Sequence, residues 1–116
     1  QGRGLIYMGY VKHHAMIVTH WDRGDINDAH RFATLTNLNP TPIVESPSNG
    51  YLSFFIPPDG SKEGWSQSNE GDEDRSRFKQ FLRKRHMHMD WTEIAYGGDD
   101  VISSIEDDCS KKDNES

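Results

Sequence analysis

The stretch PIVESPSNGYLSFFIPP, residues 42–58, carries the β-hairpin signal on which the fold assignment depends. Its Asn49-Gly50 pair supplies the two positive φ angles of a tight hairpin turn. We therefore predict strands at about residues 42–46 and 51–56, joined by this turn. Because side chains alternate along a strand, the second strand has one face made by Leu52, Phe54 and Ile56 and an opposite face made by Tyr51, Ser53 and Phe55.

One strand and one helix are predicted on each side of the hairpin. Residues 10–21, YVKHHAMIVTHW, are rich in β-branched and aromatic residues and predict a strand. Residues 25–38 predict a helix with Asp25 as its N-cap, because apolar residues recur there at helical spacing. Residues 71–87, GDEDRSRFKQFLRKRHM, predict a second helix whose acidic first turn and basic last turn match the helix dipole. Residues 89–96, MDWTEIAY, alternate as the last strand.

The resulting order, β-α-β-β-α-β, is that of the ferredoxin-like, split βαβ pattern. We expect an α+β domain with a four-stranded antiparallel sheet and both helices on one face. The other face of such a sheet has no helical layer. We expect aromatic side chains there to form an oligomer interface or a ligand platform, and we assign Tyr51, Phe55 and Trp91 to this face.

Length and composition favour a single small domain. The 116 residues suit one domain, and a hydrophobic content of 33% with a mean hydropathy of -0.87 leaves a small core. A partner subunit would complete such a core, so we expect a homo-oligomer, most simply a dimer.

Charge is concentrated at the C-terminal end of the chain. Residues 99–116 hold seven acidic side chains against two lysines, which accounts for most of the net charge of -6. We predict that residues 99–116 are an acidic, mostly disordered tail and that residues 8–98 form the single α+β domain. Residues 1–7 are interpreted as a tag remnant or a disordered N-terminus. The domain lacks the basic excess that nucleic-acid binding needs, so we expect no nucleic-acid partner.

Cysteine content and hydropathy indicate the compartment. Cys109 is the single cysteine, so no internal disulfide can form and a reducing compartment is expected. No apolar run approaches the length of about 18 residues that a membrane span requires. We therefore expect a cytoplasmic protein with no membrane partner.

No complete catalytic or metal-binding motif occurs in the sequence. The six histidines show no zinc-ligand spacing, and there is neither a G-x-S-x-G motif nor a phosphate-binding glycine loop. We predict no catalytic residue, no metal and no cofactor. The alternative that stays open is a small hydrolase or phosphodiesterase, which would need two or more of these residues to converge: His14, His20, His30, Asp22 and Asp25.

Two features favour ligand binding. Lys62 and Trp65 stand in a long loop and combine a positive charge with a stacking surface, the alternative being that Trp65 folds back as a lid on the core. Arg75, Lys79 and Arg83 follow each other at intervals of four on one side of the second helix. They could bind a phosphate group or an acidic partner. The alternatives are a solvated helix face, or a basic patch that the acidic tail covers.

Two blocks of the sequence resemble a known group of proteins. SPSNGYLSFFIPPDGSKEGWSQSNEGDEDRSRF, residues 46–78, and MDWTEIAYGGDD, residues 89–100, resemble small bacteriophage-encoded proteins that have no established activity, a likeness covering roughly residues 10–98. The resemblance implies an accessory protein in the cytoplasm of the infected host cell. By analogy with other small phage proteins, it also implies binding of a host protein or sequestration of a signalling nucleotide. Our hypothesis from the sequence is a non-catalytic binding module for a host protein or a small anionic, nucleotide-like ligand.

Overall fold

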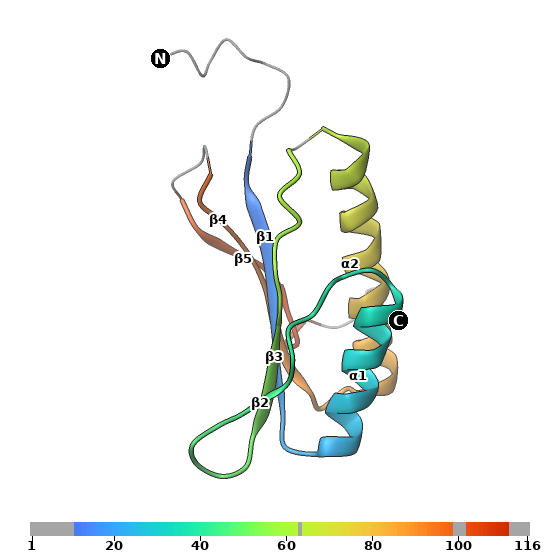
Figure 1. The fold of residues 1–116 in the computed structure, drawn as a ribbon, viewed down its shortest axis with the longest axis vertical. Helices are drawn as coiled ribbons and strands as arrows, with labels where there is room; N and C mark the ends of the chain where they lie inside the picture. The colour runs from blue at the N-terminus through green and yellow to red at the C-terminus, as the bar shows by residue number, and fades with distance from the viewer. Residues whose placement is uncertain (1–10, 63, 99–101, 112–116) are drawn as a thin grey trace.

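The computed structural model describes residues 11–62, 64–98 and 102–111, which form an α+β fold (Figure 1). Two helices lie on one side of an open, five-stranded antiparallel sheet. The elements, in chain order, are β1 (His13–His20), α1 (Arg23–Leu35), β2 (Val44–Glu45), β3 (Leu52–Ile56), α2 (Ser66–Arg85), β4 (Asp90–Tyr96) and β5 (Ser104–Asp108).

The sheet is organised around its first strand. The strand order is β2-β3-β1-β4-β5, so β1 pairs with β3 on one side and with β4 on the other. Val18 of β1 lies opposite both Phe54 and Trp91 in this register. Directly opposite residues of antiparallel strands point to the same side of a sheet. The three side chains therefore share the side that the helices cover.

The predicted count of four strands is corrected to five. Residues 104–108, which fall in the segment predicted to be mostly disordered, pair with β4 as the edge strand β5. Ion pairs with α2 help to order this strand: the Asp107 carboxylate lies 3.0 Å from Lys79 Nζ and 2.8 Å from Arg83 Nη2. The predictions for residues 1–7, 99–101 and 112–116 lie outside the described residues.

Both helices begin earlier than the sequence pattern predicts. Asp22, not Asp25, caps α1: its side chain accepts a hydrogen bond from the Asp25 amide (3.0 Å). α2 begins at Ser66 after Trp65, so the part of the predicted loop from residue 66 to residue 71 is helical. No acidic residue lies in the first turn of α2. The predicted dipole match at that end is therefore wrong, whereas the basic last turn is present.

A small apolar core fills the space between the sheet and the helices. Leu52, Phe54 and Ile56 are buried as predicted, and Phe78 of α2 packs near Phe54 with ring centroids 6.5 Å apart. The prediction that Trp91 lies on the helix-free face is wrong. Trp91 is 4% exposed and belongs to this core, because its register opposite Val18 turns it toward the helices.

Candidate functional site

The predicted basic residues of α2 are engaged by acidic residues of the same chain. Arg75 is buried, its Nε donates to Glu93 Oε2 (2.9 Å), and it also pairs with Asp72. Lys79 Nζ donates to Glu93 Oε1 (2.6 Å) and lies 3.0 Å from Asp107 Oδ2. These cations are already neutralised, so they do not form a ready binding site for an anion.

Arg83 completes the same network on the side of β5. It donates to Asp107 Oδ1 (2.8 Å) and to the carbonyl oxygen of Lys111 (3.0 Å), and its guanidinium lies 4.9 Å from the centroid of the Trp91 ring. Burial raises the pKa of Asp107, but hydrogen bonds and charge from Lys79 and Arg83 outweigh it, so the net pKa is lowered. Of the alternatives for the basic patch, covering by the acidic segment holds for Lys79 and Arg83, whereas Arg75 pairs with Asp72 and Glu93.

Lys62 and Trp65 form an exposed pair before α2. Lys62 Nζ lies 5.9 Å from the centroid of the Trp65 ring, and Trp65 is 45% exposed. Trp65 is therefore not a lid buried on the core. A cation over an indole face in water is a weak contact, of roughly 0.5–1 kcal/mol, so the pair remains available to a ligand.

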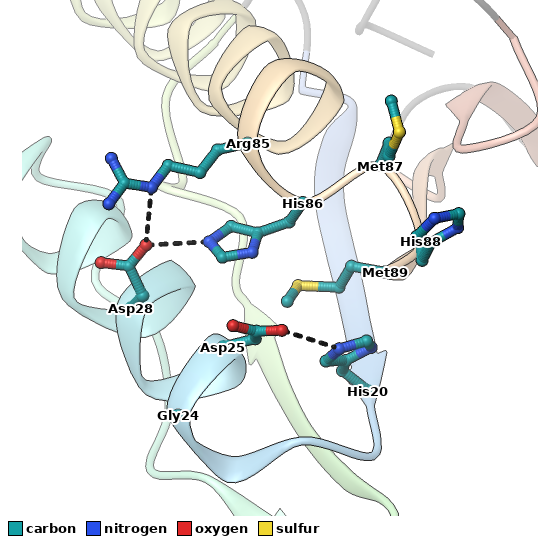
Figure 2. Close-up of a pocket in the computed structure, with 9 residues that line it drawn as sticks. All are labelled: His20, Gly24, Asp25, Asp28, Arg85, His86, Met87, His88 and Met89. Atoms are coloured by element: carbon teal, nitrogen blue, oxygen red, sulfur yellow. Dashed lines mark hydrogen bonds and ion pairs between the residues drawn. The ribbon is translucent and has the colours of Figure 1, made fainter.

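A hollow lies near the C-terminal end of α2 (Figure 2). Its volume is about 510 Å³. It is formed where the end of β1 and the start of α1 meet the segment between α2 and β4. The lining residues are His20, Gly24, Asp25, Asp28, Arg85, His86, Met87, His88 and Met89.

Two histidines in this hollow each lie beside a carboxylate of α1. His86 Nε2 lies 2.8 Å from Asp28 Oδ2, and His20 Nε2 lies 3.4 Å from Asp25 Oδ2 (Figure 2). Both imidazoles are largely buried, with side chains 8% and 6% exposed. Arg85 Nε approaches Asp28 Oδ2 at 3.5 Å from a side chain that is 65% exposed. The site thus combines two largely buried imidazoles, each beside a carboxylate, with one exposed guanidinium.

Local structure explains how these side chains are positioned. Asp25 and Asp28 are three residues apart on α1, so they project from neighbouring positions of one helix face. His86 is the C-cap of α2: its amide donates to the carbonyl oxygen of Leu82 (2.8 Å), and its ring makes a T-shaped contact with the Phe81 ring. His20 ends β1 directly before the turn that leads into α1.

Only part of the set considered for acid–base chemistry converges. His20 and Asp25 come together, whereas Asp22 is used as a helix cap and His30 Nε2 lies 2.9 Å from the carbonyl oxygen of Thr41. His14 lines a separate, small cavity beside Asp59 and Arg75.

Asp28 and His86, which complete the site, were missed by sequence reasoning. They are 58 positions apart, and no local pattern links them. Within the described residues, no group of three or more potential ligand side chains could hold a metal ion.

Of the three residues predicted for the helix-free side of the sheet, strand pairing places Phe55 there. Phe55 is half-buried and pairs with Ile17, which points away from the core. Tyr51 precedes β3 and is 38% exposed. The third predicted member of this group, Trp91, lies in the core instead.

Comparison of the chain with protein-family models, curated proteins and solved structures gave no match. Neither described helix is long and apolar enough to cross a membrane. The interpretation of the site therefore rests on its geometry.

Proposed function

We propose that this protein is a binding module that holds a small anionic ligand in the hollow between α1 and the end of α2. The observation that supports this best is the pair of largely buried imidazoles, His20 and His86, each next to its own carboxylate and close to Arg85. A cavity of about 510 Å³ suits a ligand of nucleotide size.

Protonation explains how a site with two aspartates can accept an anion. An ionised carboxylate only accepts hydrogen bonds, so the histidine nitrogen that faces it carries the proton. An arriving phosphate adds a second anionic acceptor, which favours a proton on the other ring nitrogen as well. Each imidazolium would then bridge its aspartate and the ligand, and binding would be coupled to proton uptake.

Arg85 supplies the permanent charge. Its side chain is 65% exposed and its contact with Asp28 is long, at 3.5 Å, so it can turn toward a ligand at little cost. Arg75, Lys79 and Arg83 are less suitable because an anion would first have to displace Glu93 or Asp107.

Isothermal titration calorimetry with inorganic phosphate and AMP tests this assignment. Titration in two buffers of different ionisation enthalpy should reveal proton uptake on binding. H86Q should weaken binding about ten- to a hundredfold, as expected for the loss of a charge-assisted hydrogen bond, and R85Q should weaken it as well. The matched controls are H13Q, at a histidine on the helix-free face, and K84Q, which removes an exposed charge next to Arg85.

The same titrations separate the hollow from the Lys62–Trp65 pair. The pair lies before the first residue of α2, and the hollow lies past its last residue, about 30 Å away along a helix of 20 residues. Binding that is lost in K62Q and W65L but kept in H86Q would move the ligand site to that pair. Absence of binding by either ligand at millimolar concentration would refute the proposal.

A small hydrolase or phosphodiesterase is the second candidate function. It is favoured by the two carboxylate–imidazole pairs in one hollow, since one imidazole can act as general base and the other as general acid. Turnover of bis-p-nitrophenyl phosphate that is abolished by H20Q and H86Q would establish it. Binding without turnover would reject the hydrolase and support the binding module.

Two further parts of the proposal concern fold type and origin. We propose that the domain is ferredoxin-like with an added edge strand, and the order β2-β3-β1-β4 with one helix after β1 and one after β3 supports this. We also propose an accessory role in the cytoplasm of a phage-infected host, where a host protein is the other possible partner. The sequence resemblance of residues 46–78 and 89–100 is the support for that role.

A further inference from the structure

The edge strand β5 is attached to the sheet by backbone pairing and by charge rather than by burial. The structure describes all five of its residues, and none of them is buried. Its one large apolar side chain, Ile105, is 63% exposed. Its register with β4 shifts between Glu93 and Ile94. Segments with few buried apolar contacts and a disrupted ladder open most readily in a folded protein.

Asp107 is the side chain that connects β5 to the helices. It lies directly opposite Glu93 in the register, and two carboxylates in such positions repel each other. Lys79 offsets this repulsion, because its Nζ lies 2.6 Å from Glu93 Oε1 and 3.0 Å from Asp107 Oδ2. Arg83, one turn further along α2, pairs with Asp107 at 2.8 Å. The position of β5 therefore depends on two cations of α2.

These two cations are held in place by contacts that do not involve β5. The guanidinium of Arg83 lies 4.9 Å from the centroid of the Trp91 ring, and Lys79 donates to Glu93. Among the described residues, Asp107 is the one carboxylate paired with Arg83, so opening of β5 leaves that guanidinium without an anion. It also leaves β4 as an edge with unpaired backbone groups. We call Lys79, Arg83, Trp91 and this edge of β4 the strand-binding surface.

We propose that the strand-binding surface takes up an acidic, extended segment of a partner protein, and that β5 occupies it as an internal competitor. The partner adds to β4 as an antiparallel strand and places one carboxylate between Lys79 and Arg83, where Asp107 now lies. In this mode of recognition the main chain supplies affinity and side-chain contacts supply specificity.

The structure itself shows the chemistry of the occupant. β5 has the acidic sequence SIEDD and is seated on these same groups. It contributes no residue to the apolar core, so its exchange for another strand removes no side chain from that core. The inference is independent of the ligand proposed for the hollow, because no residue of the strand-binding surface lines that hollow.

An internal competitor lowers the apparent affinity for a partner by the fraction of time that the surface is open. D107N removes the ionic contacts of β5 but leaves Lys79, Arg83 and Trp91 in place. It should therefore tighten the binding of a separate acidic peptide about five- to thirtyfold, the range that corresponds to the loss of two partly exposed ion pairs. A peptide bound elsewhere on the protein would show no such gain.

Fluorescence anisotropy with the full chain provides the measurement. The probe is a fluorescein-labelled peptide with the sequence of residues 102–111, ISSIEDDCSK, under reducing conditions. D107N should bind it more tightly than wild type, and the double variant D107N/R83Q should lose the gain. The matched control is E106Q, which makes the same change of charge at an exposed side chain of β5 and should leave the affinity unchanged.

Amide hydrogen exchange of the wild type gives a second measurement, which decides the question if D107N does not fold. The Cys109 amide donates to the carbonyl oxygen of Trp91 (3.1 Å), so its exchange should accelerate when the peptide at millimolar concentration displaces β5. The amides of β4 should stay protected, because the peptide pairs with them in place of β5.

Four results would overturn the proposal. They are no binding of the peptide by D107N at millimolar concentration, equal affinities of D107N and E106Q, a gain that D107N/R83Q retains, and an unchanged exchange rate at Cys109 when the peptide is bound. A wild-type dimer that the peptide converts to the chain mass of 13.3 kDa would make a second copy the source of the strand and would also overturn it. Loss of phosphate or AMP binding in the hollow variants would not affect these outcomes.

Discussion

Asparagine in place of Asp107 should loosen β5 from α2 and lower the free energy of unfolding by about 1–2 kcal/mol. Asp107 makes two ionic contacts, 3.0 Å to Lys79 and 2.8 Å to Arg83, and all three side chains are 17–18% exposed. Exposed pairs contribute roughly 0.2–1 kcal/mol each, and breaking a fully buried pair costs about 3–5 kcal/mol. The expected loss of stability lies nearer the value for exposed pairs, because each cation keeps another partner in D107N.

The remaining partners of the two cations are specific. Lys79 keeps its hydrogen bond to Glu93 (2.6 Å), and Arg83 keeps the carbonyl oxygen of Lys111 (3.0 Å). The cost of D107N is therefore the lost attraction, without the full penalty of an uncompensated buried charge.

The pH dependence of this effect has a definite sign. The pKa of Asp107 is lowered in the folded protein from its ordinary value of 3.8. Its contribution to stability is therefore complete above the unfolded-state pKa and is lost as the pH falls through the lower folded value. The difference between wild type and D107N should be full at pH 7 and should shrink below about pH 4.

Urea denaturation at pH 7 and pH 3, together with amide hydrogen exchange, measures both effects. Exchange should accelerate first at the Cys109 amide, which donates to the carbonyl oxygen of Trp91 (3.1 Å). The matched control is E106Q, which makes the same change of charge in β5 at an exposed side chain that contacts Ser104. Equal losses in D107N and E106Q, or a loss that does not change with pH, would refute the reasoning.

Three further substitutions test the backbone geometry and the cap of α1. G98A should lower the free energy of unfolding by at least about 2 kcal/mol, because φ is +66° there and a Cβ would lie 2.1 Å from the carbonyl oxygen of Val11. G50A, with φ at +66° in open space, should lower it by only about 1 kcal/mol in the same thermal melts. An equal loss in both variants would contradict the steric argument. D22A should lower stability by about 1 kcal/mol through loss of the α1 cap, measured by chemical denaturation, and an unchanged midpoint would show that the cap contributes nothing.

Local sequence was sufficient to predict those parts of the fold that depend on interactions between residues close together in the chain. The Asn49-Gly50 turn has the predicted positive φ at both residues, and the strand after it buries Leu52, Phe54 and Ile56. Helix ends were less well predicted. Asp22 and Asp25 are both good caps, and α2 continues toward its N-terminus through Ser66, Gln67 and Ser68, which have no strong helical pattern.

The face of each strand and the fifth strand needed information from across the fold. Alternation places Trp91 and Thr92 on opposite sides of β4 but does not say which side the helices cover, and that depends on pairing with Val18. The acidic composition of residues 99–116 predicts disorder when they are considered alone. In the fold, the negative charge of Asp107 helps to order this segment, because Lys79 and Arg83 present opposite charges at the edge of the sheet.

The sequence by itself determined the α+β class, the central hairpin and the absence of any complete catalytic motif, since each depends on residues close together in the chain. The tertiary structure alone decided the candidate site. His20 meets Asp25, and His86 meets Asp28 across 58 positions, because the packing of α2 against α1 carries the end of one helix to the start of the other. It likewise decided that the predicted anion-binding cations, Arg75, Lys79 and Arg83, are bound within the chain, since their partners Glu93 and Asp107 arrive on strands that pair only when the sheet forms.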